Sequence, residues 1–334
     1  MVWQYSSERT SLPSDAGKPE RFVEYGGIVT HRNTWAISLL LTSVFFCGVW
    51  AAPAQQLPDF DKVVIKPVKV TEGIYILFGA GGNIGVSVGS DGILLVDTQY
   101  TPLYGKIMEA LRKISSQPIR FVVNTHWHGD HIGGNELMAK AGTIVVAHDD
   151  VRRRLINQRT NPKADFRNPP MPDGTLPVIT YSDRMTLHFN GDDIEIFHVG
   201  PAHTDGDTVV YFRKANVLHT GDLLGSGRFP VYVTDNGGTI HGMIAGLDRI
   251  LTVVNADTKI IPGHGEGPTD LKTVKQQRDL LVAVRDRVLT GIQEGKSLQQ
   301  IIASKPTAEF ESPKMEGRTP DEFVTMVYQD LSRK

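Results

Sequence analysis

Three histidines and an aspartate fall within six consecutive residues, 126–131, whose sequence is HWHGDH. Imidazole nitrogens and carboxylate oxygens are the ligands that divalent zinc prefers in proteins. Residues two apart point to the same side of an extended segment, so His126 and His128 can share one metal ion. A turn after His128 directs Asp130 and His131 toward a second ion. The segment therefore predicts a metal centre and not a chance cluster of histidines.

Three further candidate ligands stand beside glycine-containing turns at the ends of predicted strands, and they are His203, Asp222 and His264. Their surroundings read GPAHT, HTGD and PGHG. Together with residues 126–131, they complete ligand sets for two metal ions. Asp97 also follows an apolar strand, and taken alone it is an ordinary turn residue. Because metal-bound histidines commonly need a carboxylate or carbonyl partner, Asp97 is also a candidate for supporting the ligands.

The predicted elements around these residues alternate between strands and helices. Runs rich in β-branched residues, separated by turns that contain glycine, predict two meanders of strands, each followed by helices. The predicted strands are 63–70, 74–78, 84–88, 93–96, 119–124, 143–147, 185–189, 193–199, 208–212, 217–220 and 259–261. The predicted helices are 102–115, 149–157, 240–253, 270–294, 298–304 and 320–332, with one more beginning near Asp130. This order predicts an α/β fold in two similar halves.

The motifs HxHxDH, GPAHTDGD, HTGD and PGHG, in this order, closely resemble those of the metallo-β-lactamase superfamily over roughly residues 63–264. The resemblance implies a four-layer αββα sandwich. We expect a hydrolase domain over 60–275 and a C-terminal helical extension over 276–334. The resemblance also implies a role for each candidate: His126, His128 and His203 bind one metal ion, Asp130, His131 and His264 bind the other, Asp222 bridges both, and Asp97 supports the ligands from outside.

Two bridged metal ions predict a hydrolase. Such ions lie about 3.5–4 Å apart, and zinc lowers the pKa of a bound water to about 7, so a bridging hydroxide can attack a carbonyl carbon at neutral pH. Asp130 is the side chain that we expect to take part in catalysis besides binding metal. We expect two zinc ions per chain, with iron or manganese as alternatives, because carboxylate ligands also suit those metals.

The substrate class is less well determined by the sequence. β-Lactamases proper have cysteine or serine where this chain has Asp222, whereas a bridging aspartate resembles the glyoxalase II and lactonase branches. Export of the protein, which the N-terminal residues 29–54 predict as described below, in contrast favours substrates outside the cytoplasm, β-lactams included. We therefore expect a β-lactamase-like carbonyl hydrolase, with thioester or lactone hydrolysis as the alternative. A secreted metal-binding protein without catalysis is the alternative from another class.

The charge balance and the composition argue against a nucleic-acid-binding protein and against a disordered one. The chain has 35 Lys and Arg against 37 Asp and Glu, a net charge of -2, which gives no reason to expect a nucleic-acid partner. A hydrophobic fraction of 40% argues against disorder. The expected partner is therefore a small-molecule substrate, and the sequence leaves the oligomeric state open.

The N-terminal region predicts export. His31 and Arg32 precede an apolar run, 35–50, that is shorter than the roughly 20 residues of a membrane-spanning helix. Ala52-Pro53-Ala54 then forms a small-x-small cleavage site. We expect a signal peptide over about 29–54, cleaved after Ala54, a periplasmic or secreted protein, and no retained membrane anchor. An uncleaved anchor is the alternative.

A signal counted from Met1 is longer than the usual 15–30 residues or so, whereas one counted from Val29 has the usual length. Translation from Val29 is therefore the hypothesis that we set against a start at Met1. The single cysteine, Cys47, lies within the apolar run and would be removed with the signal.

Overall fold

The structure is a computed structural model that describes residues 57–160, 176–312, 315 and 317–333. The predicted signal peptide, its cleavage site and the alternative start at Val29 lie outside the described residues. The metal-ligand candidates all lie within them.

The first sheet has seven strands, which follow one another in chain order. The first four form an antiparallel meander because short glycine-containing turns join them, and the last three add in parallel because helices connect them. The strands are β1 (Lys66–Thr71), β2 (Ile74–Phe78), β3 (Ile84–Gly89), β4 (Gly92–Val96), β5 (Ile119–Val123), β6 (Ile144–His148) and β7 (Ile179–Tyr181). No pattern in the sequence predicted β7, which is only three residues long.

The second sheet has five strands in the order β12-β11-β10-β9-β8. The strands β8 to β11 form an antiparallel meander, and β12 adds parallel to β11 after a helical connection. They are β8 (Arg184–Phe189), β9 (Asp192–His198), β10 (Thr208–Phe212), β11 (Val217–His219) and β12 (Lys259–Ile261). The two predicted meanders are therefore two separate sheets.

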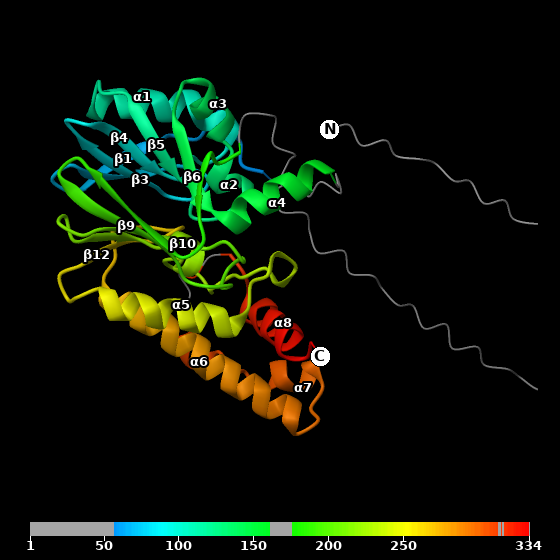
Figure 1. Ribbon diagram of the computed structural model, residues 1–334. Helices are drawn as coiled ribbons and strands as arrows, with labels where there is room; N and C mark the ends of the chain where they lie inside the picture. The colour runs from blue at the N-terminus through cyan, green and yellow to red at the C-terminus, as the bar shows by residue number, and fades with distance from the viewer. Residues whose placement is uncertain (1–56, 161–175, 313–314, 316, 334) are drawn as a thin grey trace, which may run out of the picture. The chain divides into compact units, whose positions relative to one another are not determined.

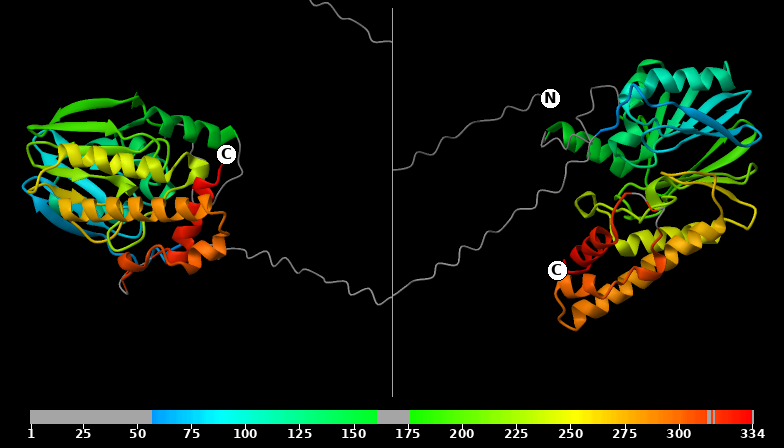
Figure 2. Two further views of the ribbon diagram at one scale, coloured as in Figure 1. Left: turned by 90° about the horizontal axis from the view of Figure 1, so that it is seen from below. Right: turned by 180° about the vertical axis from the view of Figure 1, so that it is seen from behind.

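Helices cover the outer face of each sheet, so the molecule has the predicted four-layer αββα architecture (Figures 1 and 2). On the first sheet these are α1 (Tyr104–Ile114), α2 (Gly129–Ile132), α3 (Asn135–Lys140) and α4 (Asp149–Thr160). On the second they are α5 (Ile240–Val253) and α6 (Leu271–Gln293), which lie side by side, followed by α7 (Leu298–Ala303) and α8 (Pro320–Leu331). Thr239, Asp270, Ser297 and Thr319 cap the N-termini of α5, α6, α7 and α8 with their side chains.

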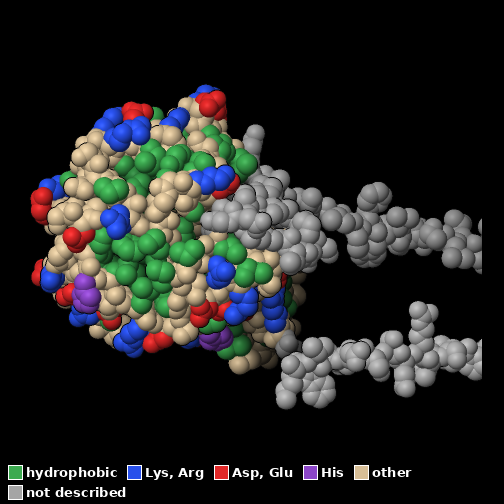
Figure 3. All heavy atoms as spheres, turned by 45° about the horizontal axis from the view of Figure 1, so that its top comes forward, with side chains coloured by type: hydrophobic (Ala, Val, Ile, Leu, Met, Phe, Trp, Pro, Cys, Tyr) green, Lys and Arg blue, Asp and Glu red, His purple; other side chains and the backbone are tan. Residues whose placement is uncertain are grey.

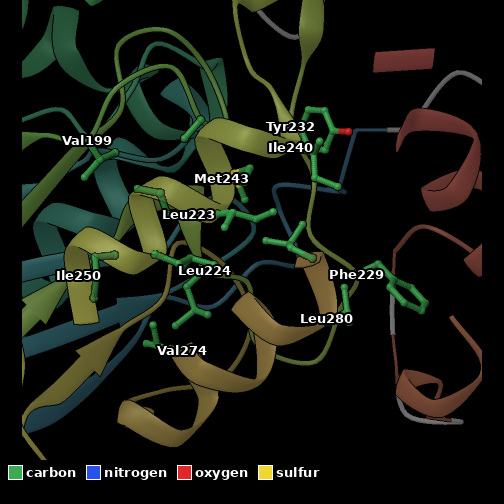
Figure 4. Close-up of a cluster of buried hydrophobic side chains, with 14 of the residues drawn as sticks. Val199, Leu223, Leu224, Phe229, Tyr232, Ile240, Met243, Ile250, Val274 and Leu280 are labelled. Carbon is green, nitrogen blue, oxygen red and sulfur yellow. The ribbon is translucent and has the colours of Figure 1, made fainter. Parts of the chain in front are cut away.

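Among the described residues, three large hydrophobic clusters, with a smaller fourth beside α2 and α4, hold the layers together. One lies between the sheets and contains Ile76 and Val123 of the first and Ile196 and Val210 of the second, all fully buried. A second joins the first sheet to α1 and α3. The third joins the second sheet to α5, α6 and α8 (Figure 4). Burial of each large aliphatic side chain stabilises the fold by about 1.5–3 kcal/mol before the entropic cost of ordering the chain.

The predicted boundary between a hydrolase domain and a C-terminal extension lies at residues 275 and 276. It falls inside α6, which runs without a break from Leu271 to Gln293. The third hydrophobic cluster continues from Phe197 in β9 to Val327 in α8, so the C-terminal helices share a core with the second sheet. Residues 56–334 form one unit. The helical C-terminal region is present, but it is an integral layer of the domain.

The surface drawn in Figure 3 combines apolar patches with basic and acidic side chains interspersed around them. Val64 and Val178 have the largest exposed fractions among the large hydrophobic residues described, at 78% and 72%. Within the described ranges, no helix has both the length and the apolar character needed to cross a bilayer.

Candidate metal centre

All seven candidate ligands come together at one edge of the two sheets, where strands end. His126 and His128 follow β5, and Asp130 and His131 lie in the short α2. The remaining three follow strands of the second sheet: His203 lies between β9 and β10, Asp222 in the 3₁₀ turn Gly221–Leu223 after β11, and His264 after β12. The strand ends thus place residues that are up to 138 positions apart in the chain beside one another.

The first cluster consists of His126, His128 and His203. Nδ1 of His128 lies 3.1 Å from Nε2 of His126 and 3.0 Å from Nε2 of His203, so three ring nitrogens converge on one point. Burial lowers the pKa of His126 well below its usual range and that of His128 to about 3. Both imidazoles are therefore neutral at pH 7, which is the form that binds a metal ion.

The second cluster consists of Asp130, His131 and His264. The Nε2 atoms of His131 and His264 lie 3.2 Å apart. Oδ2 of Asp130 lies 3.3 Å from Nε2 of His264 and 3.8 Å from Nε2 of His131. Burial alone would lower the pKa of His264, but Asp222 and Asp130 outweigh it and raise this pKa to about 9. Burial likewise opposes ionisation of Asp130, but His131 and His264 lower its pKa below the usual range. This cluster therefore favours positive charge, which a divalent cation supplies while displacing the protons of its ligands.

Asp222 lies between the two clusters. Its Oδ1 is 3.2 Å from Nε2 of His131, and its Oδ2 is 3.4 Å from Nε2 of His203 and 3.3 Å from that of His264. Oδ1 is buried and makes no well-formed hydrogen bond within the part of the chain that the structure describes. A buried carboxylate oxygen without a well-formed hydrogen bond is costly, and a metal ion satisfies it. The donor set and this oxygen both fit a centre for divalent metal ions.

Asp222 is held in place by the two residues that follow it in the sequence. Leu223 and Leu224 are 1% and 0% exposed and insert between α5 and α6, where they join the cluster that contains Met243 and Val274 (Figure 4). The short turn that carries the carboxylate is thereby anchored in the hydrophobic core. A ligand fixed by packing loses little conformational entropy when it binds metal.

Asp97 supports ligands of both clusters. Its Oδ2 lies 2.7 Å from Nδ1 of His131 and accepts a hydrogen bond of 2.7 Å from Oγ1 of Thr125, and its Oδ1 accepts one of 2.8 Å from the Thr125 amide. Oγ1 of Thr125 in turn lies 3.0 Å from Nδ1 of His126. Asp97 is fully buried and adopts φ 68°, a left-handed conformation that aspartate tolerates better than most residues. The carboxylate thus orients His131 directly and His126 through Thr125.

The turn between β2 and β3 closes over the second cluster. The amide of Gly82 donates to the carbonyl oxygen of Asp130 at 3.0 Å, and a Cβ atom at residue 82 would lie 2.2 Å from Cε1 of His131. Only glycine therefore permits this approach. Asn83 donates from Nδ2 to the carbonyl oxygens of Pro262 and Gly265, at 2.9 and 3.0 Å, and so fixes the loop that carries His264.

Three contacts at the ligands or at the backbone that flanks them could not be found from the sequence. They are the side chain of Asn83, the carbonyl oxygen of Val231 and the side chain of Asn236. The carbonyl oxygen of Val231 lies 2.7 Å from Nδ1 of His203, and Nδ2 of Asn236 lies 2.9 Å from Nε2 of His128. No spacing in the sequence signals these residues, because their partners lie between 28 and 182 positions away.

Comparison with known proteins places this arrangement in a family. The sequence model of the family described as the metallo-beta-lactamase superfamily matches residues 78–264, which is more than half of the 334-residue chain. The chain belongs to the metallo-β-lactamase superfamily. A solved metallo-beta-lactamase from Pontibacter korlensis has a similar fold, with a TM-score of 0.54 and 20% identity, over 65% of this chain and 99% of that one.

Relatives in the family differ in what they are named for. The chain is 23% identical to a type 2 metallo-beta-lactamase of Bacteroides fragilis, over 70% of this chain and 92% of the relative. It is 28% identical to the alpha subunit of the 2,4-dinitroanisole O-demethylase of Nocardioides sp., over 49% of this chain and only 44% of that subunit. It is 31% identical to a hydroxyacylglutathione hydrolase of Pelagibacter ubique, over 32% of this chain and 36% of the relative. Membership in this superfamily is generally associated with divalent metal ions and hydrolysis.

Proposed function

We propose that this protein is a dinuclear zinc hydrolase of small carbonyl substrates, β-lactamase-like in its reaction. The observation that carries the proposal is the pair of adjoining donor clusters with the buried Asp222 carboxylate between them. His126, His128 and His203 would hold one ion, and Asp130, His131 and His264 the other. The relative from Bacteroides fragilis, matched over most of its length, supports β-lactams as the first substrates to test.

When bound, two zinc ions would lower the pKa of a water molecule to about 7 and polarise the carbonyl oxygen of the substrate. The side chains of the protein have separate tasks. The neutral imidazoles of His126 and His128 present lone pairs, and Asp97 keeps His131 in one orientation. The ionised Asp130, whose side chain is 23% exposed, can accept a hydrogen bond from the attacking water and so orient it, while the proton that the water loses ends on the leaving atom. One C–O bond forms, and the C–N, C–O or C–S bond of the substrate breaks.

Thioester or lactone hydrolysis is the second candidate. The observation that favours it is the carboxylate of Asp222, which lies within 3.4 Å of three histidine nitrogens from both clusters. The similarity to a hydroxyacylglutathione hydrolase covers only 32% of this chain and supports the same reading.

A panel of substrates tests the function. Zinc-loaded protein that begins at Gln55 is assayed with a chromogenic cephalosporin, S-lactoylglutathione, an acyl-homoserine lactone and an aryl phosphodiester. We expect turnover of the cephalosporin above all. We also expect two zinc ions per chain by elemental analysis, and about one in His264→Ala, because His264 belongs to the second cluster alone.

His188→Ala is the matched control, because this histidine has a 78% exposed side chain and pairs with Asp193. It should keep both ions and full activity. Preference for the thioester or lactone would select the second candidate. Two bound ions without turnover of any substrate would indicate a metal-binding protein without catalysis. A single bound ion with activity intact would refute the dinuclear centre.

We also propose that the protein is exported to the periplasm or secreted, and that the mature chain begins at Gln55. The support is the order of a basic pair, an apolar run and the small-x-small site that ends at Ala54. The intact mass of exported protein should match a chain that starts at Gln55. A mass that includes residues 35–50 would contradict cleavage, and peptides from upstream of Val29 in whole-cell lysate would contradict the alternative start.

A further inference from the structure

A loop of the second sheet, residues 231–239, lies against the first donor cluster. The carbonyl oxygen of Val231 lies 2.7 Å from Nδ1 of His203, and the amide of Val233 donates to the carbonyl oxygen of the same histidine at 2.9 Å. The side chain of Asn236 reaches His128. At Gly238, a Cβ atom would lie 2.3 Å from the carbonyl oxygen of His203, so the loop packs closely against the cluster.

We propose that Asn236 is a positioning residue that fixes the orientation and the tautomer of His128. The inference rests on the proposed metal centre, because it concerns the ring nitrogen that faces away from the metal. Nδ1 of His128 converges with the ring nitrogens of His126 and His203, so Nδ1 is the metal-binding atom. Nε2 of a ring bound through Nδ1 carries a hydrogen and needs an acceptor.

In the other two histidines of the cluster, an oxygen atom accepts the hydrogen of the outward ring nitrogen. Nδ1 of His126 faces Oγ1 of Thr125 at 3.0 Å, and Nδ1 of His203 faces the carbonyl oxygen of Val231 at 2.7 Å. His128 differs because its outward nitrogen faces a side-chain amide at 2.9 Å. An amide can turn by about 180° and present either Oδ1 or Nδ2 at the same place. Asn236 can therefore pair with either tautomer of His128, and Oδ1 is the atom that suits the metal-binding one.

Backbone and side-chain contacts hold Asn236 in position. The backbone amide of Asn236 donates to the carbonyl oxygen of Val233 at 2.9 Å, and its backbone carbonyl oxygen accepts from the backbone amide of Asp205 at 2.9 Å. Arg154 forms an ion pair of 2.7 Å with Asp205 and donates to the carbonyl oxygen of Asp235 at 3.2 Å. The side chain is thus aimed at His128 by a loop that is fixed on both sides.

Helix α8 adds a second anchor to the same loop. Asp330 accepts a hydrogen bond of 2.7 Å from the amide of Ile240, the first residue of α5 and the residue that directly follows the loop. The end of the loop, at Ile240, is therefore tied to the C-terminal helix. Preorganisation of this kind is what an outer partner of a metal ligand requires.

The test compares Asn236→Ala, Asn236→Asp and Asp235→Asn with the wild-type protein. Zinc affinity is measured by competition with a chromophoric chelator, and folding is checked by thermal unfolding of the metal-free proteins. We expect about 10–100-fold weaker binding of one zinc ion in Asn236→Ala, the usual effect of removing an outer partner. Asn236→Asp, which keeps an acceptor at this place, should restore the affinity. Asp235→Asn alters an 87% exposed neighbour and should change it by less than about twofold.

A nitrogen-15 NMR spectrum of the histidines gives a readout that a general loss of structure would not reproduce. In the zinc-loaded wild type, Nε2 of His128 should carry a slowly exchanging hydrogen, and this hydrogen should exchange faster in Asn236→Ala. Unchanged zinc affinity and unchanged exchange in Asn236→Ala would overturn this inference alone. A wild-type protein that binds no zinc would overturn the proposed function and this inference together.

Discussion

Asp222→Asn should remove the second metal ion and lower activity at pH 7 by at least about 100-fold. A neutral amide is a much poorer metal ligand than a carboxylate. It also places N–H groups where Asp222 now lies 3.2–3.4 Å from the nitrogens of His131, His203 and His264. Metal content by elemental analysis and initial rates on the substrate panel measure the two effects.

Asp248→Asn is a suitable control for Asp222→Asn. It also neutralises one carboxylate, but Asp248 lies on α5 and pairs with Arg278 at 2.9 Å. The control should keep its metal and its activity. If Asp222→Asn also kept the metal content and the rate of the wild type, Asp222 would be a structural residue at a strand end, and the bridging arrangement would have to be abandoned.

Asp222→Cys separates the two candidate functions. A thiolate can still hold the second metal ion, but it does not bridge in the same geometry. We expect measurable cephalosporin hydrolysis to remain and any thioesterase or lactonase activity to disappear.

Asp97→Asn should weaken the affinity for metal by about 10–100-fold and lower the free energy of unfolding by about 1–3 kcal/mol. The carboxylate receives the Thr125 amide and hydroxyl and faces Nδ1 of His131, whereas an amide places N–H groups beside one of these donors. Asparagine also tolerates the left-handed conformation at φ 68°, so the substitution tests the hydrogen bonds and not the backbone. Chelator competition and urea unfolding measure the two quantities.

Thr125→Val helps to assign the route through which Asp97 acts. It removes the hydroxyl that links Asp97 to His126 and leaves the contact with His131 in place. We expect weaker binding in the first cluster only. Unchanged metal affinity in Asp97→Asn would show that Asp97 is an ordinary turn residue, the alternative that its sequence context alone suggests.

The sequence predicted the fold and the identity of the converging residues because each candidate ligand lies in a short motif at the end of a strand. The structure brings all seven together, and Asp97 lies against His131 as expected for a supporting residue. These motifs are local, so their residue types and spacing carry the information. The four-layer architecture followed from the resemblance that the motifs carry.

Other features could not be predicted from local patterns. Asn236 contacts His128 across 108 positions of the chain, and the side chain of Asn83 reaches the His264 loop from 179 and 182 positions away. The three residues of β7 are too few to show strand alternation. The boundary at 275 was drawn about ten residues after the last motif ends at Gly265, although the helical pattern over 270–294 already continued through it. Packing of α8 into the same core, which makes the region one layer, depends on tertiary contacts.

The position of the clusters at the edge of both sheets has a thermodynamic consequence. His131 belongs to the half of the molecule built on the first sheet, whereas His203 and His264 follow strands of the second. A metal ion held by residues from both halves binds the folded chain and not the unfolded one, so it joins the sheets as a crosslink does. Each tenfold rise in free metal concentration above the dissociation constant then adds about 1.4 kcal/mol to the apparent free energy of unfolding. For the proposed metal centre, the supply of metal would therefore set the fraction of chains that is folded.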